Sequence, residues 1–176
     1  MSWISTYTGR HFNYQSPSLE DICIEDIAHA LSQINRFCGH TCFPYSVAQH
    51  SVGASYLVPP DFAFEALMHD AHEAYVTDMM SPLKRLLPDY QQIEADIEVM
   101  MRLKFDLPLK MSAEVKHADL VMLATEKEAL LHPLSGEWPI LRGIEPAQRI
   151  IVPIVPMSAI DAKREFMDRF NELFPQ

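Results

Sequence analysis

The sequence predicts a mostly helical fold in a single domain, with a short β-hairpin at the N-terminus as the exception. Apolar residues recur at spacings of three and four along most of the 176 residues, which is the period of a buried helix face. Prolines and glycines interrupt these runs. The sequence contains no domain linker and no internal repeat. A chain of this length can bury a sizeable core as one domain.

The N-terminal segment 4–14 is the predicted hairpin, because its residues alternate on either side of Thr8-Gly9-Arg10. Ser46 and Gln49 form a capping-box pattern at the start of a helix, and Ser112 is a plausible cap for a later one. The segment 132–156 contains proline and glycine and is expected to be irregular. The predicted helices span 24–37, 46–58, 62–76, 81–87, 90–103, 113–131 and 158–173.

Composition excludes several classes of protein. The net charge of −10 argues against broad binding to a nucleic-acid polymer, which needs a basic face. Charges interrupt each apolar run well before the roughly 20 residues of a membrane span, so a soluble protein with no membrane partner is expected. The N-terminus has no secretory pattern, which indicates the cytoplasm, or a host cytoplasm if the chain is viral. Cys23, Cys38 and Cys42 are expected to be reduced thiols, because their number is odd and no export signal is visible. Cys38 and Cys42 are not expected to form a structural zinc site, which needs a second cysteine pair.

Three helices with apolar residues on most faces each carry ionisable side chains. In 62–76, His69, Asp70 and Glu73 can border one cavity, since residues three and four apart are neighbours on a helix. His50 is the ionisable residue of 46–58, and Asp119 stands among apolar residues of 113–131. Alone, His50 would be interpreted as a core or surface histidine and Asp119 as a capping or salt-bridged carboxylate.

Together, these side chains offer two imidazoles and two carboxylates, a set that suits a divalent transition metal such as Mn, Fe, Co or Zn. A bound metal would explain how the charges are tolerated, and it would support hydrolysis by activating water and polarising a phosphoryl oxygen. Other enzyme classes fail on spacing. A zincin motif would need histidine at the position of Val76, and the chain has no glycine-rich phosphate loop and no nucleophile elbow.

The order His50, His69-Asp70 and Asp119 resembles the H…HD…D signature of the HD-domain metal-dependent phosphohydrolases. Further stretches extend this resemblance over nearly the whole chain, toward the bacterial 5′-deoxynucleotidase branch that includes the YfdR-like members. These stretches are Arg36-Phe37, His50-Ser51, 69–74, Asp78, 81–84 and 115–120. The resemblance implies an all-α HD-domain bundle with one divalent ion, either Co, Mn, Zn or Fe, with Mg as a further candidate.

The resemblance also implies residue roles. Glu73 and Asp78 match an acidic pair beside the metal, which orients or activates the attacking water and assists the leaving oxygen; the division between them stays open. The implied metal ligands are His50, His69, Asp70 and Asp119.

Three residues match positions that contact the substrate. Arg36 matches an arginine that grips the phosphate, and Lys84 is placed to help; the alternative for both is an exposed charge with surface contacts. Phe37 stands where relatives place an aromatic residue against the sugar, which would disfavour a ribose 2′-hydroxyl, although a phenylalanine after a helix also suits the core. Thr77 departs from the small residue, often glycine, that many relatives carry there.

Three functions remain in competition. The leading one is a 5′-deoxynucleotidase, which converts a deoxynucleoside monophosphate and water to a deoxynucleoside and phosphate. The second is a triphosphohydrolase, which releases tripolyphosphate from a substrate such as dATP. The third is a noncatalytic nucleotide-binding protein, which is disfavoured because neither a metal ligand nor Glu73 is lost. The resemblance further implies a homo-oligomer, a dimer or larger.

Overall fold

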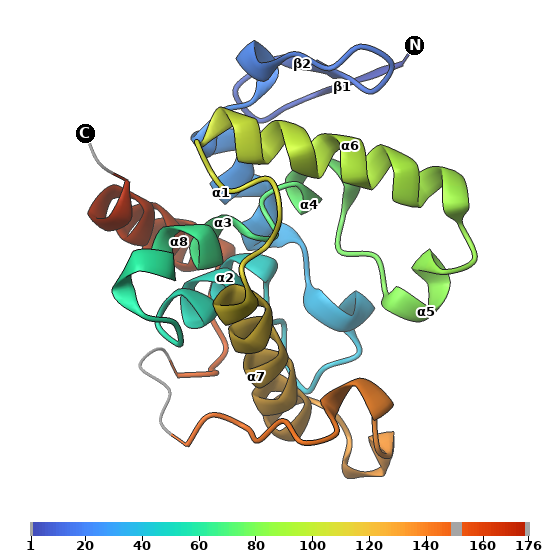
Figure 1. The fold of residues 1–176 in the computed structure, drawn as a ribbon, viewed down its shortest axis with the longest axis vertical. Coiled ribbons are helices and arrows are strands. Elements are labelled where there is room, and N and C mark those ends of the chain that lie inside the picture. The colour runs from blue at the N-terminus through green and yellow to red at the C-terminus, as the bar shows by residue number, and fades with distance from the viewer. Residues whose placement is uncertain (1, 149–152, 175–176) are drawn as a thin grey trace.

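The computed structural model describes residues 2–148 and 153–174, and it is mostly helical with an N-terminal hairpin, as predicted (Figure 1). No helix in this part of the chain is long and apolar enough to cross a membrane. The strands are β1 (Trp3–Ser5) and β2 (His11–Asn13), and the helices are α1 (Ile24–Gln33), α2 (Val47–Ser55), α3 (Ala63–Met68), α4 (Glu73–Val76), α5 (Ser81–Lys84), α6 (Pro88–Lys104), α7 (Ala113–Leu130) and α8 (Ala159–Leu173).

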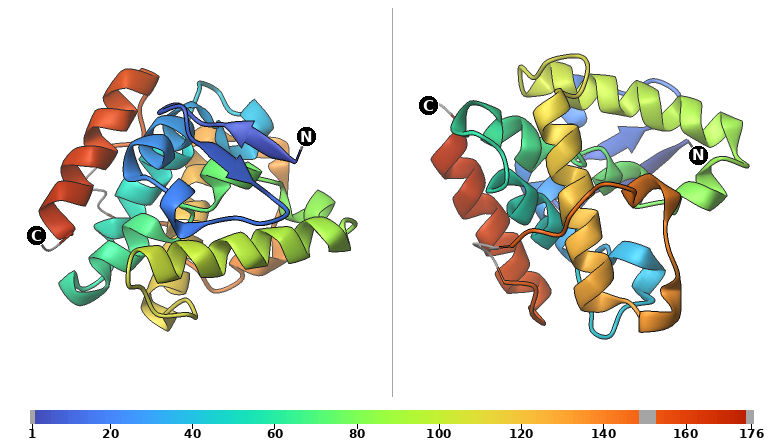
Figure 2. Two further views of the ribbon diagram at one scale, coloured as in Figure 1. Left: turned by 90° about the horizontal axis from the view of Figure 1, so that it is seen from above. Right: turned by 60° about the horizontal axis from the view of Figure 1, so that its bottom comes forward.

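The hairpin is antiparallel and lies over α1 and α4 (Figure 2). Ile4 pairs with Phe12, whose side chain is fully buried in the core. At the turn, the backbone N–H and the hydroxyl of Thr8 donate to the carboxylate of Asp26 on α1, at 2.7 and 2.9 Å. These contacts fix the N-terminal segment to the helical core.

Helix α2 is the central element, and every one of its residues is buried. It packs against α1, α3, α7 and α8, which shield it from water. A polar side chain on α2 therefore needs a hydrogen-bond or ion-pair partner within the protein. Gly53 allows α7 to approach closely, because a Cβ atom there would lie 2.8 Å from the Cε atom of Met122. The capping box at Ser46 and Gln49 is confirmed and fixes the start of this helix.

The helix predicted for 24–37 ends earlier, at Gln33. Asn35 is extended and pairs with Ser46 in an isolated antiparallel bridge. The N–H of Arg36 donates to the carbonyl of Tyr45 at 2.9 Å, and the chain then makes a 3₁₀ turn, Arg36–Gly39. This pairing with a segment ten residues away competes with the helix, and it places Arg36 beside the start of α2.

The prediction of one helix over 62–76 is also wrong, because the chain forms α3 and α4 with a tighter turn between them. In that turn the N–H of Ala71 donates to the carbonyl of Met68, and the N–H of Glu73 to that of Asp70, both at 3.0 Å. These are i→i+3 bonds of the 3₁₀ type, which rotate side chains away from their α-helical positions. The break falls on the His69-Asp70 pair.

Helix α4 ends at Val76, and the next residue, Thr77, has a backbone φ of 70° and ψ of 158°. A β-branched residue is strained in this region, which glycine adopts readily. The hydroxyl of Tyr90 on α6 donates to the carbonyls of Val76 and Thr77, at 3.0 and 3.2 Å. The turn that leads to Asp78 is therefore held from α6.

Two further boundaries differ in detail from the prediction. The side chain of Ser112 forms no capping hydrogen bond with α7. The backbone N–H of Ser112 donates instead to the carboxylate of Glu65, at 2.9 Å. The segment predicted to be irregular, 132–156, contains the 3₁₀ turns Pro133–Ser135 and Pro139–Leu141. Residues 149–152 of that segment lie outside the described part of the chain.

Candidate metal centre

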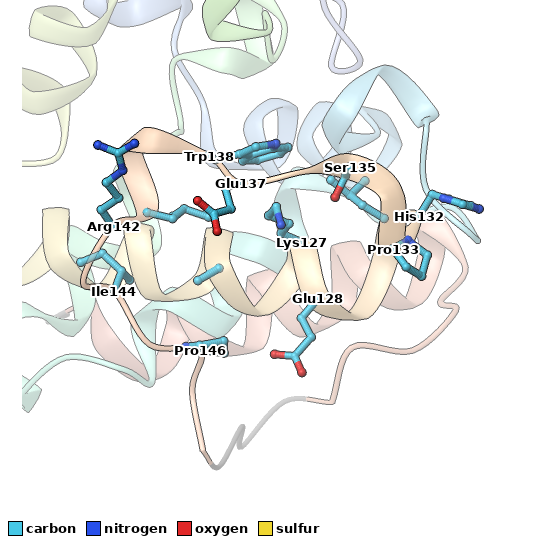
Figure 3. Close-up of a pocket in the computed structure, with 13 residues that line it drawn as sticks. Lys127, Glu128, His132, Pro133, Ser135, Glu137, Trp138, Arg142, Ile144 and Pro146 are labelled. Atoms are coloured by element: carbon cyan, nitrogen blue, oxygen red, sulfur yellow. The ribbon is translucent and has the colours of Figure 1, made fainter.

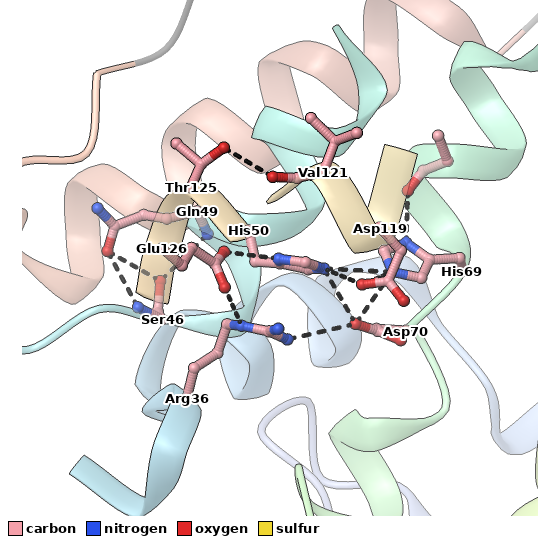
Figure 4. A network of polar contacts seen from close by, with 11 residues as sticks. Arg36, Ser46, Gln49, His50, His69, Asp70, Asp119, Val121, Thr125 and Glu126 are labelled. Atoms are coloured by element: carbon pink, nitrogen blue, oxygen red, sulfur yellow. Dashed lines mark hydrogen bonds and ion pairs between the residues drawn. The ribbon is translucent and has the colours of Figure 1, made fainter. Parts of the chain in front are cut away.

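Of the four side chains predicted as metal ligands, His50 from α2, His69 from the turn between α3 and α4, and Asp119 from α7 converge at one point, and Asp70 lies beside both histidines (Figure 4). The Nε2 atom of His50 lies 3.2 Å from Oδ1 of Asp119 and 3.3 Å from Nε2 of His69. One ligand atom each from these three residues fits within a span of 4.8 Å, so the cluster could hold a metal ion. Oδ2 of Asp70 lies 3.1 Å from Nε2 of His69 and 3.6 Å from Nε2 of His50.

The orientation of both imidazole rings suits a metal. Nδ1 of His69 lies 2.7 Å from the carbonyl oxygen of Ala66, and Nδ1 of His50 lies 2.6 Å from Oε1 of Glu126. Both oxygens are acceptors, so each Nδ1 carries a proton and donates it. Each Nε2 atom then faces the cluster, which is the arrangement that protein metal sites use to fix a histidine ligand.

The electrostatics of the cluster favour a cation. Burial would raise the pKa of Asp119, but hydrogen bonds from His50 and His69 hold it well below its usual value. Burial would lower the pKa of His69, yet the charge of Asp70 and the hydrogen bond to Asp119 raise it well above its usual value. The negative charges of Asp70 and Asp119 therefore favour a positive charge beside the two Nε2 atoms. Protons on the histidines or a bound metal ion can supply this charge.

A cavity of about 520 Å³ opens in front of this cluster. His50 and His69 lie behind it, in the core. Its lining includes all the other predicted site residues, namely Arg36, Phe37, Asp70, Glu73, Asp78, Lys84 and Asp119. Residues that are far apart in the sequence are thus brought to a single hollow beside the candidate metal centre.

Glu73 and Asp78 have unusual environments at the wall of this cavity. Glu73 is buried, and its Oε2 atom has no hydrogen-bond partner among the described residues. Burial raises the pKa of Glu73 well above its usual value, and the charges of Asp70 and Asp78 add to this effect. Burial also raises the pKa of Asp78, against the opposing charge of Arg36. The Oε2 atom of Glu73 is therefore free to form a hydrogen bond with a molecule bound in the cavity.

The three residues predicted to contact substrate have different surroundings. Arg36 is buried, with Nε 2.9 Å from Oε2 of Glu126 and Nη1 3.7 Å from Oδ2 of Asp70, so the alternative of an exposed surface charge is wrong. Lys84 lines the cavity, but its ammonium group lies 2.7 Å from Glu94 on α6. Phe37 both lines the cavity and packs in a small apolar cluster, with its ring 6.2 Å from that of Trp138.

Two residues at the site were missed by sequence reasoning. Glu126 is fully buried and contacts both His50 and Arg36. A signal existed, because residues seven apart share a helix face and Glu126 follows Asp119 by seven positions. Trp138 lines the cavity from an irregular segment, where no helical or strand period indicates a direction.

A second cavity, of about 690 Å³, lies between α7 and the segment after it (Figure 3). It is the larger of the two, but it contains none of the predicted site residues. Its charged lining mixes Lys127 and Arg142 with Glu128 and Glu137. Trp138 lines both cavities. The candidate site is therefore assigned to the smaller cavity on its chemistry.

Comparison with known proteins gives two relatives. The chain is 51% identical to the uncharacterized protein YfdR of Escherichia coli K12 over 173 residues, which cover 98% of this chain and 96% of the relative. It is 32% identical over 127 residues to the uncharacterized protein RCAP_rcc00048 of Rhodobacter capsulatus, covering 66% of this chain and 65% of that protein. No protein-family model matches the chain.

Proposed function

We propose that this chain, which belongs to the family of the Escherichia coli protein YfdR, is an HD-type, metal-dependent phosphohydrolase that acts on deoxynucleoside 5′-monophosphates. The names of the relatives state no activity, so the support comes from the site. The observation that carries the proposal is the meeting of His50, His69 and Asp119 within 4.8 Å, beside a cavity that Arg36 also lines.

The chain's own residues can bind and orient a phosphate ester in this cavity. A divalent ion held by His50, His69, Asp70 and Asp119 would polarise a phosphoryl oxygen and lower the pKa of a bound water. Arg36 offers a planar guanidinium, which suits a phosphate group. Its ion pairs with Glu126 and Asp70 hold the side chain in place before substrate arrives.

Glu73 and Asp78 would carry protons in the reaction. Hydrolysis forms a bond between the water oxygen and phosphorus and breaks the bond to the 5′ oxygen, so a proton leaves the water and another reaches the leaving oxygen. The raised pKa of each carboxyl group lets it hold a proton nearer neutral pH than usual. The two groups lie in the wall of the same cavity, which suits them to this transfer.

The charge of the cavity supports a monophosphate over a triphosphate. Its lining has four acidic side chains, Asp70, Glu73, Asp78 and Asp119, and three basic ones, Arg36, Lys84 and Arg85. The ammonium group of Lys84 is already paired with Glu94. A monophosphate carries about two negative charges at neutral pH and a triphosphate about twice as many. One metal ion and Arg36 can balance the charge of a monophosphate much better than the charge of a triphosphate.

Phe37 and Trp138 would contact the nucleoside. Both line the cavity, and their rings pack against each other. Phe37 follows Arg36 directly and lines the same cavity, which supports a contact of its ring with the sugar of a nucleotide whose phosphate Arg36 binds. Trp138 offers an aromatic surface of the kind on which nucleobases stack. This arrangement supports a preference for deoxyribose through exclusion of the 2′-hydroxyl by Phe37.

The test is a hydrolysis assay of the purified protein loaded with Mn, Co, Mg or Zn. The substrates are 5′-monophosphates and triphosphates of the common deoxynucleosides and ribonucleosides, and the products are identified as phosphate or tripolyphosphate. We expect inorganic phosphate from deoxynucleoside monophosphates and slower release from the ribose forms. Asp119→Asn should lose the activity, and the surface variant Glu128→Gln should keep it.

Two results would replace the proposal. Tripolyphosphate from a deoxynucleoside triphosphate, without phosphate from the monophosphates, would make the protein a triphosphohydrolase. Nucleotide binding without turnover by any metal form would make it a noncatalytic binding protein.

A further inference from the structure

Glu126 is a fully buried carboxylate that lies between the metal centre and the phosphate-binding arginine (Figure 4). Its Oε1 atom lies 2.6 Å from Nδ1 of His50, and its Oε2 atom lies 2.9 Å from Nε of Arg36. It shares a face of α7 with Asp119, which precedes it by two helical turns. One side chain thus contacts a candidate metal ligand and the candidate phosphate ligand, each through a different oxygen.

Only an ionised carboxylate satisfies both contacts. Nε of Arg36 is a donor at any physiological pH, so the oxygen facing it is an acceptor. Nδ1 of His50 has to be a donor if Nε2 is to bind a metal, so the second oxygen is an acceptor as well. Glutamine has one acceptor oxygen and one NH₂ group. Whichever way its amide is turned, it meets one of the two donors with another donor.

On the basis of the proposed metal and phosphate site, we infer that Glu126 is a positioning residue that couples metal binding to phosphate binding. It keeps the imidazole of His50 in the tautomer whose Nε2 faces the metal, and it holds the guanidinium of Arg36 at the cavity wall. Asp70 closes the arrangement from the other side, since its Oδ2 atom lies 3.7 Å from Nη1 of Arg36. Glu126 therefore holds both the side chain that would bind the metal, His50, and the side chain that would bind the phosphate, Arg36.

A purely structural role for Glu126 makes a different prediction. A buried ion pair with Arg36 could serve the fold alone, as the pair of Glu65 with Arg102 does away from the cavity, at 3.3 Å. Loss of such a pair lowers stability but leaves ligand affinity unchanged in the molecules that remain folded. Affinity measurements on folded protein separate the two roles, and neither needs turnover.

The experiment measures two dissociation constants for Glu126→Gln: that of Mn²⁺ for the metal-free protein, and that of inorganic phosphate for the Mn²⁺-loaded protein. Because the amide can satisfy one donor at most, at least one affinity is expected to fall by about 10- to 100-fold. Glu126→Asp is the second variant. It keeps the buried charge, but it is one methylene too short to reach both partners, so the same loss is expected.

Glu65→Gln is the matched control, because it also removes a buried carboxylate that pairs with an arginine. Both of its affinities should stay within about twofold of the wild-type values. If folded Glu126→Gln or Glu126→Asp keeps both affinities within that limit, the inference is overturned, whatever the change in melting temperature. If the affinities fall but no deoxynucleotide is hydrolysed by the wild type, the proposed activity fails and the positioning role of Glu126 stands.

Discussion

The carboxyl group of Glu73 is buried, and its Oε2 atom forms no hydrogen bond with the described residues. Glutamine has the same shape but cannot transfer a proton, so Glu73→Gln should retain metal affinity within about twofold and lower kcat by about 10²- to 10⁴-fold. Steady-state hydrolysis and a Mn²⁺ titration of the same preparation test this prediction. Wild-type turnover in the variant would remove Glu73 from the mechanism.

The histidines of the cluster predict a pH dependence of metal binding. Burial lowers the pKa of His69, but Asp70 and Asp119 raise it well above its usual value, and the pKa of His50 is also raised. A metal has to displace a proton from each Nε2 atom, so affinity should rise with pH and level off above the folded-state pKa values. Mn²⁺ titrations between about pH 6 and 9, in buffers of different ionisation enthalpy, measure the released protons. Affinity that does not change over this range would contradict the prediction.

Sequence reasoning found the residues whose burial conflicts with their charge. His50, His69 and Asp119 could be noticed because each stands in a largely apolar stretch of sequence. Glu126 was missed because it lies near the end of a helix with charged neighbours, where a carboxylate normally faces water. The spacing of seven from Asp119 indicates its helix face, but its partner Arg36 lies 90 residues earlier, and no local pattern identifies that partner.

At the scale of elements, the segments that differ from prediction are those that aim the site's side chains. The turn between α3 and α4 carries His69 and Asp70, and the bridge of Asn35 with Ser46 places Arg36. Helical periodicity predicted continuous helices there, because it reports which residues are buried and not which hydrogen bonds form. At Asn35 the hydrogen bonds come from a separate segment of the chain, and at the turn between α3 and α4 they are local bonds of the 3₁₀ type. The hairpin and the helix starts, which depend on local signals, were predicted well.

The strained turn at Thr77 predicts a stabilising substitution. A non-glycine residue at this φ strains the folded backbone by about 1–3 kcal/mol. Glycine avoids the strain, but it loses more conformational entropy on folding, which costs about 0.5–1 kcal/mol. Thr77→Gly should therefore raise the free energy of unfolding by about 1 kcal/mol, as measured by urea denaturation. Thr77→Ala should gain less, because alanine keeps a Cβ atom. Destabilisation by glycine would show that contacts of the threonine side chain outweigh the strain.

At the scale of the whole molecule, the candidate ligands come from three segments that meet only in the folded protein. Metal should therefore bind the folded state preferentially, and saturation at about 100 times Kd should add about 2.7 kcal/mol to the free energy of unfolding. Thermal unfolding with Mn²⁺ and with a chelator tests this expectation. Asp119→Asn should lose the metal-dependent rise in Tm, and an equal rise in that variant would place the ion elsewhere.

The sign of the pH effect on the metal-free fold is opposite to that on metal affinity. A histidine whose pKa is raised in the folded state adds stability that is full below its unfolded value of about 6.5. That contribution is lost as the pH rises through the folded value. Protons on the histidines therefore stabilise the metal-free protein at low pH. At higher pH these protons are lost, and a metal ion can bind in their place.

The exposure of the ligands also sets how an ion can exchange. The side chains of His50 and His69 are 0% and 1% exposed, and those of Asp70 and Asp119 are 16% and 34% exposed. An ion would thus enter and leave past the two carboxylates, through the hollow that a nucleotide would fill. Occupancy of that hollow would block the exit, so the residence time of the ion should lengthen during turnover. A chelator should strip the resting protein faster than protein saturated with phosphate.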